Sequence, residues 1–169
     1  MARNYLGLAL YSGLMVLLAW HPAAAASTSP KGAASYPPGS ILIKTSERRL
    51  YLVLKNGSTI SYPVAVGRQG RRWQGRSVVT RKVLQPTWAP PATIRREKPG
   101  LPKIVPPGPR NPLGAAVLVL GDGTYGIHGT NRDSSIGTAA SYGCFRMHNR
   151  DVLDLYSRVR IGTSVFVLR

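Results

Sequence analysis

The sequence predicts one domain that is mainly β with short helices. Three observations support this class: apolar segments of strand length recur along the 169 residues, an Asn56-Gly57 pair separates two of them, and only residues 149–159 have clear helical periodicity. A hydrophobic content of 43% is enough for a packed core despite the net charge of +17. We therefore expect a folded, basic β domain with a helix packed on it.

The first 26 residues have the features of an export signal. Arg3 gives the start a positive charge, residues 6–20 are apolar, and residues 23–26 are alanines that suit cleavage. The apolar stretch is short for a membrane span, which needs about 20 apolar residues. We expect a cleaved signal peptide over residues 1–26, no stable membrane span after cleavage, and a periplasmic or wall-facing location. An uncleaved anchor is the alternative.

A short polar segment separates this leader from the domain. Residues 27–39 are small, polar and proline-bearing, which predicts a flexible linker. The folded domain is then expected over residues 40–169.

The first third of the domain reads as a β-meander. Residues 41–44 and 50–54 are apolar, and residues 60–66 alternate between apolar and smaller or polar side chains. Asn56-Gly57 predicts a type I′ turn, because both central positions of that turn need positive φ.

The middle of the chain is unusually rich in proline. Residues 86–112 contain nine of the fourteen prolines, so regular structure cannot extend far there. We expect a short helix near residues 92–98 within an ordered excursion across one face of the sheet. Long irregular loops in compact domains often act as lids or binding walls.

The last third contains strands and the clearest helix. Strands are expected at residues 115–120, 125–128 and 165–168. Asn149 is a suitable N-cap for a helix that runs to residue 159. Its apolar face follows the spacing i, i+3, i+4, i+7: Val152, Leu155, Tyr156 and Val159.

Charge and cysteine content exclude several classes. The chain has 23 Lys and Arg against 6 Asp and Glu, and its one cysteine rules out an intrachain disulfide framework. Eleven of the basic residues lie within residues 68–110, where Glu97 is the only acid. This region is either a solvated basic face or a surface that holds an anionic wall polymer. A nucleic-acid partner is not expected, because the chain is exported and lacks an interleaved aromatic platform.

Two segments concentrate reactive side chains. Residues 127–130 contain His128, and residues 141–149 contain Cys144 beside Gly143. A thiol attacks a carbonyl as the thiolate, which needs a base such as histidine, and histidine can then protonate a leaving amine. Backbone N–H groups at Gly143 and Cys144 suit an oxyanion. The planar guanidinium of Arg146 suits a substrate carboxylate.

Other interpretations of the same residues remain open at this point. A single cysteine is commonly a small buried apolar side chain, and a histidine after a strand is often structural. His128, Cys144 and His148 could also contribute to a zinc site, although the spacing is unfamiliar and a further ligand is lacking. Spacing alone does not decide between His128 and His148 as the base.

Several motifs together resemble the L,D-transpeptidase catalytic domain, and the cysteine segment is the most specific of them. The resemblance extends over residues 40–169. The motifs are His128-Gly129-Thr130, Ser135-Ile136-Gly137, Ser141-x-Gly143-Cys144-x-Arg146-Met147-x-Asn149, Asp151, Leu155-Tyr156, Asn111-Pro112-Leu113-Gly114 and Val64-Ala65-Val66-Gly67.

The resemblance implies a β-sandwich-like fold and assigns roles to individual residues. Cys144 would be the nucleophile, His128 the proton donor and acceptor, and Gly129 the residue whose carbonyl orients the imidazole. Gly143 would contribute its backbone to the oxyanion site. No cofactor or metal is implied. The substrate-binding residues would be Ser141, Tyr142, Arg146 and Asn149.

The implied reaction is acyl transfer between peptidoglycan stem peptides. Cys144 would attack the third residue of a donor tetrapeptide and release D-alanine, and the amine of a second stem peptide would resolve the thioester. Water, a free D-amino acid or an outer-membrane protein are alternative acceptors. A hypothesis of a different class is a catalytically inactive wall-binding protein. The presence of both His128 and Cys144 argues against it.

Two departures from the family pattern concern the mouth of the site. Many members have histidine where this chain has Tyr142, which leaves His128 as the only base within the motifs. Many also have a Thr-Pro-x-Gly turn where this chain has residues 71–75, with the sequence Arg-Arg-Trp-Gln-Gly. We therefore expect the groove entrance to differ there.

Overall fold

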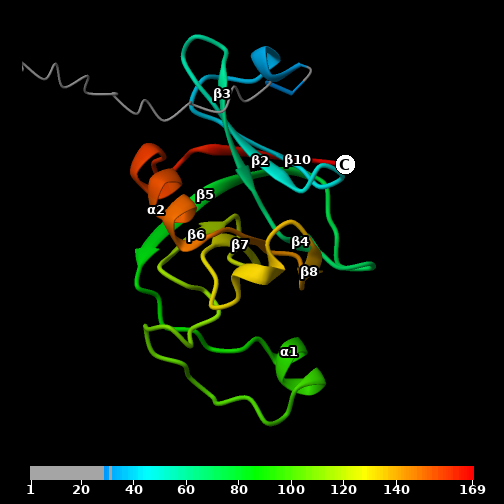
Figure 1. Cartoon of the computed structure of the whole chain (residues 1–169), viewed down its shortest axis with the longest axis vertical. Helices are drawn as coiled ribbons and strands as arrows, with labels where there is room; N and C mark the ends of the chain where they lie inside the picture. Colours follow the sequence, from blue (N-terminus) through cyan, green and yellow to red (C-terminus); the bar gives the residue numbers. More distant parts are fainter. Residues whose placement is uncertain (1–28, 31) are drawn as a thin grey trace, which may run out of the picture.

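The computed structural model describes residues 29, 30 and 32–169, so the signal peptide expected over residues 1–26 lies outside the described residues. An eight-stranded sheet dominates the structure, with a second, two-stranded sheet beside it and helix α2 packed against it (Figure 1). The prediction of a mainly β domain with short helices is confirmed.

The large sheet has the spatial order β3-β2-β1-β10-β5-β6-β7-β9, and the small sheet pairs β4 with β8. The elements are β1 (Ile41–Lys44), β2 (Arg49–Val53), β3 (Thr59–Pro63), β4 (Val66–Gly67), β5 (Gly75–Leu84), α1 (Ala92–Glu97), β6 (Ala116–Leu120), β7 (Tyr125–His128), β8 (Ala139–Ser141), β9 (Phe145–Arg146), α2 (Asn149–Arg158) and β10 (Ser164–Leu168).

Strands β1, β2 and β3 form the expected antiparallel meander. The turn between β2 and β3 differs from the expected type I′ turn, because Gly57 has a φ of 77° whereas Asn56 is not among the residues with positive φ. The Gly57 N–H donates to Leu54 O at 3.0 Å, and Asn56 Oδ1 accepts from the Ser58 N–H at 3.1 Å. The asparagine therefore closes the turn with its side chain rather than with a left-handed backbone.

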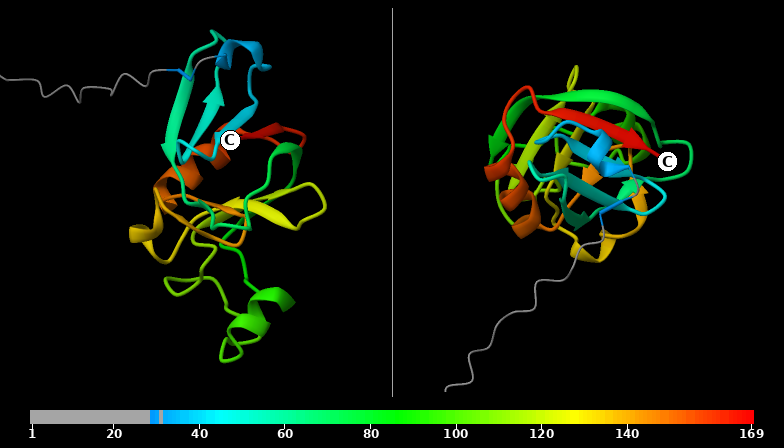
Figure 2. Two further views of the ribbon diagram at one scale, coloured as in Figure 1. Left: turned by 90° about the vertical axis from the view of Figure 1, so that its right-hand side faces the viewer. Right: turned by 90° about the horizontal axis from the view of Figure 1, so that it is seen from above.

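Strand β5 joins the two halves of the large sheet. Its first part pairs with β10 and its second part with β6, and the register shifts between Val79 and Arg81. The sheet curls around this shared strand, as the two views in Figure 2 show. The sequence analysis missed β5, because only Val79 of its ten residues is buried and the strand has no clear alternating pattern.

One hydrophobic core lies between the two halves and under α2. Val152, Leu155 and Val159 of the predicted helix face are buried in it, which confirms that face, although α2 ends at Arg158. The N-cap is His148 rather than Asn149, and its side chain makes no capping bond. The largest fully buried side chains are Phe145, Ile41, Leu42, Ile43, Leu50, Leu118, Leu120, Ile127, Met147 and Leu155.

The proline-rich excursion, residues 86–112, projects from the body of the sheet and contains α1, as expected (Figure 2). Asn111 is fully buried at the end of the excursion. Its Nδ2 donates to Pro86 O at 2.7 Å and to the carbonyls of Val105 and Pro106, both at 3.1 Å. One side chain therefore holds the start and end of the excursion together without a regular ladder.

Part of the segment expected as a linker has local structure. A 3-10 helix spans Ala33–Ser35, and Ala33 is buried. The linker and domain boundaries stay predictions. In the part of the chain that the structure describes, no helix combines the length and apolar character that crossing a membrane requires.

Candidate active site

The predicted base ends one strand, and the predicted nucleophile directly precedes the parallel neighbour of that strand. Ile127 of β7 pairs with Phe145 of β9, and His128 pairs with Arg146. Paired residues of neighbouring strands point to the same face, so His128 and Arg146 share one face while Ile127 and Phe145 lie in the core on the other. Cys144 is the residue before β9, 16 positions after His128 in sequence.

The His128 ring is buried and held by its own backbone. Nδ1 lies 2.7 Å from Gly129 O, so it carries the proton and donates, and Nε2 keeps its lone pair. Burial lowers the pKa of His128 from 6.5 to about 4, against the opposing effect of the Gly129 carbonyl. The imidazole is therefore neutral near pH 7, which is the form a general base needs.

The Cys144 thiol is half-buried, and burial raises its pKa. The Gly126 backbone N–H and the charge of Arg146 act in the opposite direction. Among the described residues, no hydrogen bond joins the thiol to the His128 ring. The resting site therefore favours a neutral thiol and a neutral imidazole.

Ser141 organises the turn before the cysteine from a buried position. Its Oγ accepts from the Gly143 N–H at 3.1 Å and donates to Cys144 O at 2.5 Å. The Gly143 N–H, which was expected to face an oxyanion, is therefore bound inside the turn in this state. Ser141 contacts the backbone of the nucleophile segment, and its predicted contact with substrate stays a prediction.

Two aromatic side chains fix Gly143, and the sequence analysis assigned neither of them. Trp73 Nε1 donates to Gly143 O at 3.1 Å, and the indole stacks on Tyr125 with ring centroids 4.9 Å apart. Gly143 has a φ of 119°, and a Cβ at this position would clash with the Tyr125 ring. Trp73 lies in residues 71–75, the segment that departs from the family pattern. That departure was the only feature of the sequence that pointed to Trp73 as part of the site.

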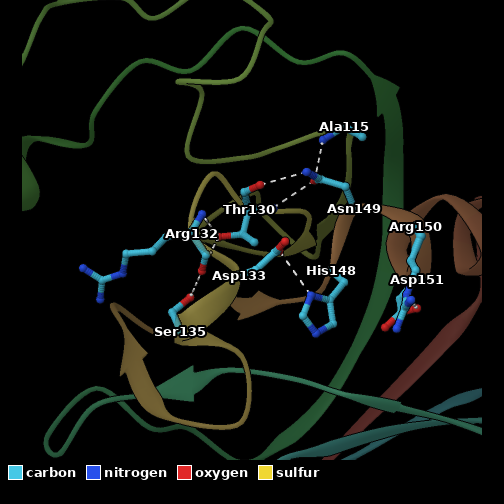
Figure 3. Close-up of polar contacts among 9 residues, drawn as sticks. All are labelled: Ala115, Thr130, Arg132, Asp133, Ser135, His148, Asn149, Arg150 and Asp151. Carbon is cyan, nitrogen blue, oxygen red and sulfur yellow. Dashed lines mark hydrogen bonds and ion pairs between the residues drawn. The ribbon is translucent and has the colours of Figure 1, made fainter.

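Asn149 ties three backbone segments together beside the site. Its Oδ1 accepts from Ala115 N at 3.0 Å and Thr130 N at 3.1 Å, and its Nδ2 donates to Thr130 O at 2.9 Å (Figure 3). Thr130 directly follows Gly129, so these bonds hold the carbonyl that orients His128. The contacts of Asn149 indicate that it positions the backbone around His128. Its predicted contact with substrate stays a prediction.

The second histidine is engaged elsewhere. His148 Nδ1 lies 3.1 Å from Asp133 Oδ1, which belongs to the segment that follows β7 (Figure 3). This contact leaves His128 as the better placed of the two candidate bases. Among residues 29, 30 and 32–169, no three His, Cys, Asp or Glu side chains come together as a metal-binding group.

Tyr142 connects the cysteine turn to the proline-rich excursion. Its hydroxyl donates to Glu97 Oε2 at 2.7 Å, and Arg68 lies over its ring at 4.3 Å from the centroid. Glu97 also pairs with Arg68 at 2.7 Å and Arg71 at 3.2 Å. The pKa of Glu97 is lowered, first by Arg68 and then by Tyr142.

A groove of about 1090 Å³ opens between the excursion and the face that bears the reactive residues. Tyr142 and Arg146, which flank Cys144 in sequence, both line it. Arg146 is half-buried, and its pKa is lowered by burial and by the nearby charge of Arg132. The predicted substrate residues Tyr142 and Arg146 thus line one groove, whereas Cys144 and His128 are not among the described residues that line it.

The structure is a curled sheet with a histidine at the end of one strand and a Gly-Cys turn directly before its parallel neighbour. The chain matches the L,D-transpeptidase catalytic domain of the YkuD family over residues 38–167. It therefore belongs to that family.

Named relatives agree with this membership. The chain is 38% identical over 135 residues to "Probable L,D-transpeptidase ErfK/SrfK" of Escherichia coli K12, which covers 76% of this chain and 43% of that protein. It is 39% identical over 134 residues to "Probable L,D-transpeptidase YbiS" of the same strain, covering 74% and 43%. The chain thus spans less than half the length of these relatives.

Solved structures share the fold. L,D-transpeptidase 3 of Mycobacterium tuberculosis aligns with a TM-score of 0.62 at 14% identity, covering 79% of this chain and 62% of that one. The catalytic domain of an Enterococcus faecium L,D-transpeptidase, solved acylated by ertapenem, aligns with a TM-score of 0.59 at 17% identity, covering 79% and 98%.

Proposed function

We propose that this protein is an L,D-transpeptidase that acts on peptidoglycan stem tetrapeptides through a thioester on Cys144. The observation that carries the proposal is the orientation of His128. Its Nδ1 is fixed on Gly129 O, which leaves Nε2 unprotonated, and His128 pairs with Arg146 on the strand that Cys144 directly precedes. Family membership over residues 38–167 supports the same chemistry.

In the first half-reaction, the thiol proton moves to His128 Nε2 as Sγ attacks the carbonyl carbon of the third residue of the donor peptide. The tetrahedral intermediate then collapses, the C–N bond breaks, and His128 returns the proton to the leaving amine of D-alanine. The Cys144 N–H is our proposed donor to the oxyanion, because the Gly143 N–H is bound by Ser141.

In the second half-reaction, the side-chain amine of another stem peptide attacks the thioester. His128 takes a proton from that amine and the C–S bond breaks, so that a new amide forms and the thiol is restored. No step of this scheme requires a metal or cofactor. Water, a free D-amino acid or the amine of an outer-membrane protein would follow the same path and yield different products.

The proposed location is the periplasm or another wall-facing compartment. Residues 1–26 would act as the signal peptide that directs export of the protein to it. The peptidoglycan substrate lies in that compartment. A net charge of +17 suits an enzyme that works on an anionic polymer.

Incubation with purified disaccharide tetrapeptides tests the proposal. We expect cross-linked dimers that have lost one D-alanine, identified by mass spectrometry, and none with Cys144→Ala. Trimmed tripeptides or exchanged D-amino acids would instead name water or the free amino acid as the acceptor. No change in the tetrapeptides under any of these conditions would contradict the proposal.

A carbapenem provides an independent test of the nucleophile, because ertapenem acylates the Enterococcus faecium domain. We expect one adduct per chain on wild type and none on Cys144→Ala. His128→Gln should slow adduct formation by about 100-fold, the scale of general-base catalysis.

A further inference from the structure

The groove that Tyr142 and Arg146 line, two residues to either side of Cys144 in sequence, has an unbalanced charge. Five of its lining residues are basic, and no Asp or Glu is among them. Arg68 is neutralised by Glu97. The other four have no carboxylate partner within the part of the chain that the structure describes: Lys98, Arg110, Arg132 and Arg146.

Two of these cations lie close enough to repel each other. The charge of Arg132 acts on the half-buried Arg146 across the groove. The Arg132 side chain extends away from the Asp133–His148 pair, so the nearest acid of its own loop is engaged elsewhere (Figure 3). Arg110 and Arg132 are exposed at the groove, whereas Arg146 is half-buried. Like charges gathered along one groove suit an anionic ligand.

A hydrogen bond connects the two segments that carry Arg110 and Arg132. Asn131 Nδ2 donates to Arg110 O at 2.9 Å, which ties the end of the excursion to the loop that carries Arg132. The guanidinium-bearing residues 110 and 132 therefore belong to two segments that meet. Guanidinium groups bind carboxylates with two parallel hydrogen bonds, which distinguishes a carboxylate from a carboxamide.

We propose that this groove selects acyl donors by their free carboxylates, with Arg110 and Arg132 as specificity-determining residues. The inference rests on the proposed function and deepens it by naming the substrate class. A stem tetrapeptide has a C-terminal carboxylate, and its acidic and diamino-acid residues have further carboxylates unless these are amidated. The preferred donor is the form in which they are free.

The remaining wall of the groove fits the rest of such a peptide. Trp88, Ile94 and Val105 line it and offer apolar surface beside the cations. A peptide with charged carboxylates and a short aliphatic backbone matches both kinds of surface. An amidated donor would keep the apolar contacts but leave the cations without a counter-charge.

The test compares matched tetrapeptide donors, one with free carboxylates and one in which the internal carboxylates are carboxamides. The rate of D-alanine release is measured with each donor. We expect wild type to favour the free-acid donor by about tenfold or more in kcat/KM, mainly through KM, because a contact kept from ground state to transition state changes binding. Added salt should shrink the preference.

Arg132→Gln and Arg110→Gln should each reduce that preference by raising KM for the free-acid donor alone. Arg160→Gln, an exposed arginine outside the groove lining, is the matched control and should leave the ratio unchanged. Alkylation of Cys144 by uncharged iodoacetamide should proceed equally in all variants, which separates a lost carboxylate contact from a damaged site.

Each outcome decides between the two claims. Equal use of both donors by wild type, or a preference for the amidated donor, would overturn the inference and leave the proposed function standing. An unchanged preference in both arginine variants would overturn the assignment of those residues. No D-alanine release from either donor would refute the proposed function, and the inference with it.

Discussion

The proposed chemistry depends most on His128, whose imidazole is buried. The Gly129 carbonyl fixes its tautomer, and burial keeps it neutral with a pKa of about 4. Burial also raises the pKa of Cys144. The two shifts together imply that proton transfer accompanies attack on the substrate instead of preceding it.

This implication predicts little thiolate in the resting enzyme. Thiolate absorbance at 240 nm, measured as wild type minus Cys144→Ala, should be near zero at pH 7 and rise only in alkaline solution. The acylation rate should be flat near neutral pH and fall as the pH drops through about 4, because protonated His128 cannot accept the thiol proton. A full thiolate signal at pH 7 would instead indicate a resting ion pair.

The sequence was informative about single residues where chemistry restricts the choice. Cys144 and His128 were predicted from their reactivity and motif, and their catalytic roles stay predictions; the structure has His128 at the end of β7 and Cys144 directly before β9. Asn149 and Trp73 were not assigned positioning roles, because these depend on backbone groups distant in sequence. When a side chain bonds to the backbone of another segment, the amino-acid sequence of that segment carries no sign of the contact.

At the scale of elements, the loop that leads into β5 supports the cysteine turn. Trp73 both stacks on Tyr125 and donates to Gly143 O, so it fixes the peptide group next to the nucleophile. The segment that differs from the family pattern is thus part of the candidate site.

Trp73→Phe should keep the stacking and remove only the hydrogen bond. We expect acylation by a carbapenem to slow by about fivefold, since a lost hydrogen bond costs about 1 kcal/mol, with only a small change in melting temperature. Gln74→Ala, an exposed neighbour, is the control. A wild-type rate in Trp73→Phe would show that stacking alone positions Gly143.

Strand β5 and helix α2 are joined by one lysine. Lys82 Nζ donates to Tyr156 O at 2.7 Å and Val159 O at 2.6 Å, and lies 4.2 Å from the centroid of the Tyr156 ring. A cation bound to the final carbonyls of a helix also interacts favourably with the helix dipole.

Lys82→Met should therefore lower the free energy of unfolding by about 1–3 kcal/mol, through lost hydrogen bonds to a charged group. Arg81→Met changes the exposed neighbouring residue and should have an effect within about 0.5 kcal/mol. Equal effects of the two substitutions in urea titrations would argue that the bonds to α2 contribute nothing.

Element prediction succeeded where buried apolar residues form a run or one face. Strands β1 and β7 are almost wholly buried, and α2 has one apolar face, whereas the short strands β8 and β9 around Cys144 were not predicted. Strand β5 has no such pattern, because nearly all of its side chains lie outside the core and its position is set by pairing with β10 and β6. Without β5 the curl of the sheet could not be derived from periodicity.

At the scale of the whole molecule, folding encloses a group that would otherwise titrate near pH 6.5. His128 has an ordinary pKa of 6.5 and a folded pKa of about 4. Between these values the unfolded chain binds a proton that the folded protein does not. The resulting contribution to stability is complete above pH 6.5 and is lost as the pH falls toward 4.

The free energy of unfolding should therefore decrease from pH 6.5 to pH 4 more steeply in wild type than in His128→Gln. Denaturant titrations at several pH values measure this difference. The carboxyl groups with lowered pKa, such as Asp154, act below this window, because their ordinary values are near 4. Parallel curves for the two proteins would contradict the buried neutral imidazole.

The central claim is that Cys144 forms a thioester with the donor peptide, assisted by His128. Intact-protein mass spectrometry of the enzyme mixed with a tetrapeptide donor and no acceptor amine tests it most directly. We expect a mass increase equal to the donor minus D-alanine, mapped to the peptide that contains Cys144, formed about 100-fold more slowly by His128→Gln. An adduct on another residue, or an undiminished rate in His128→Gln, would contradict it.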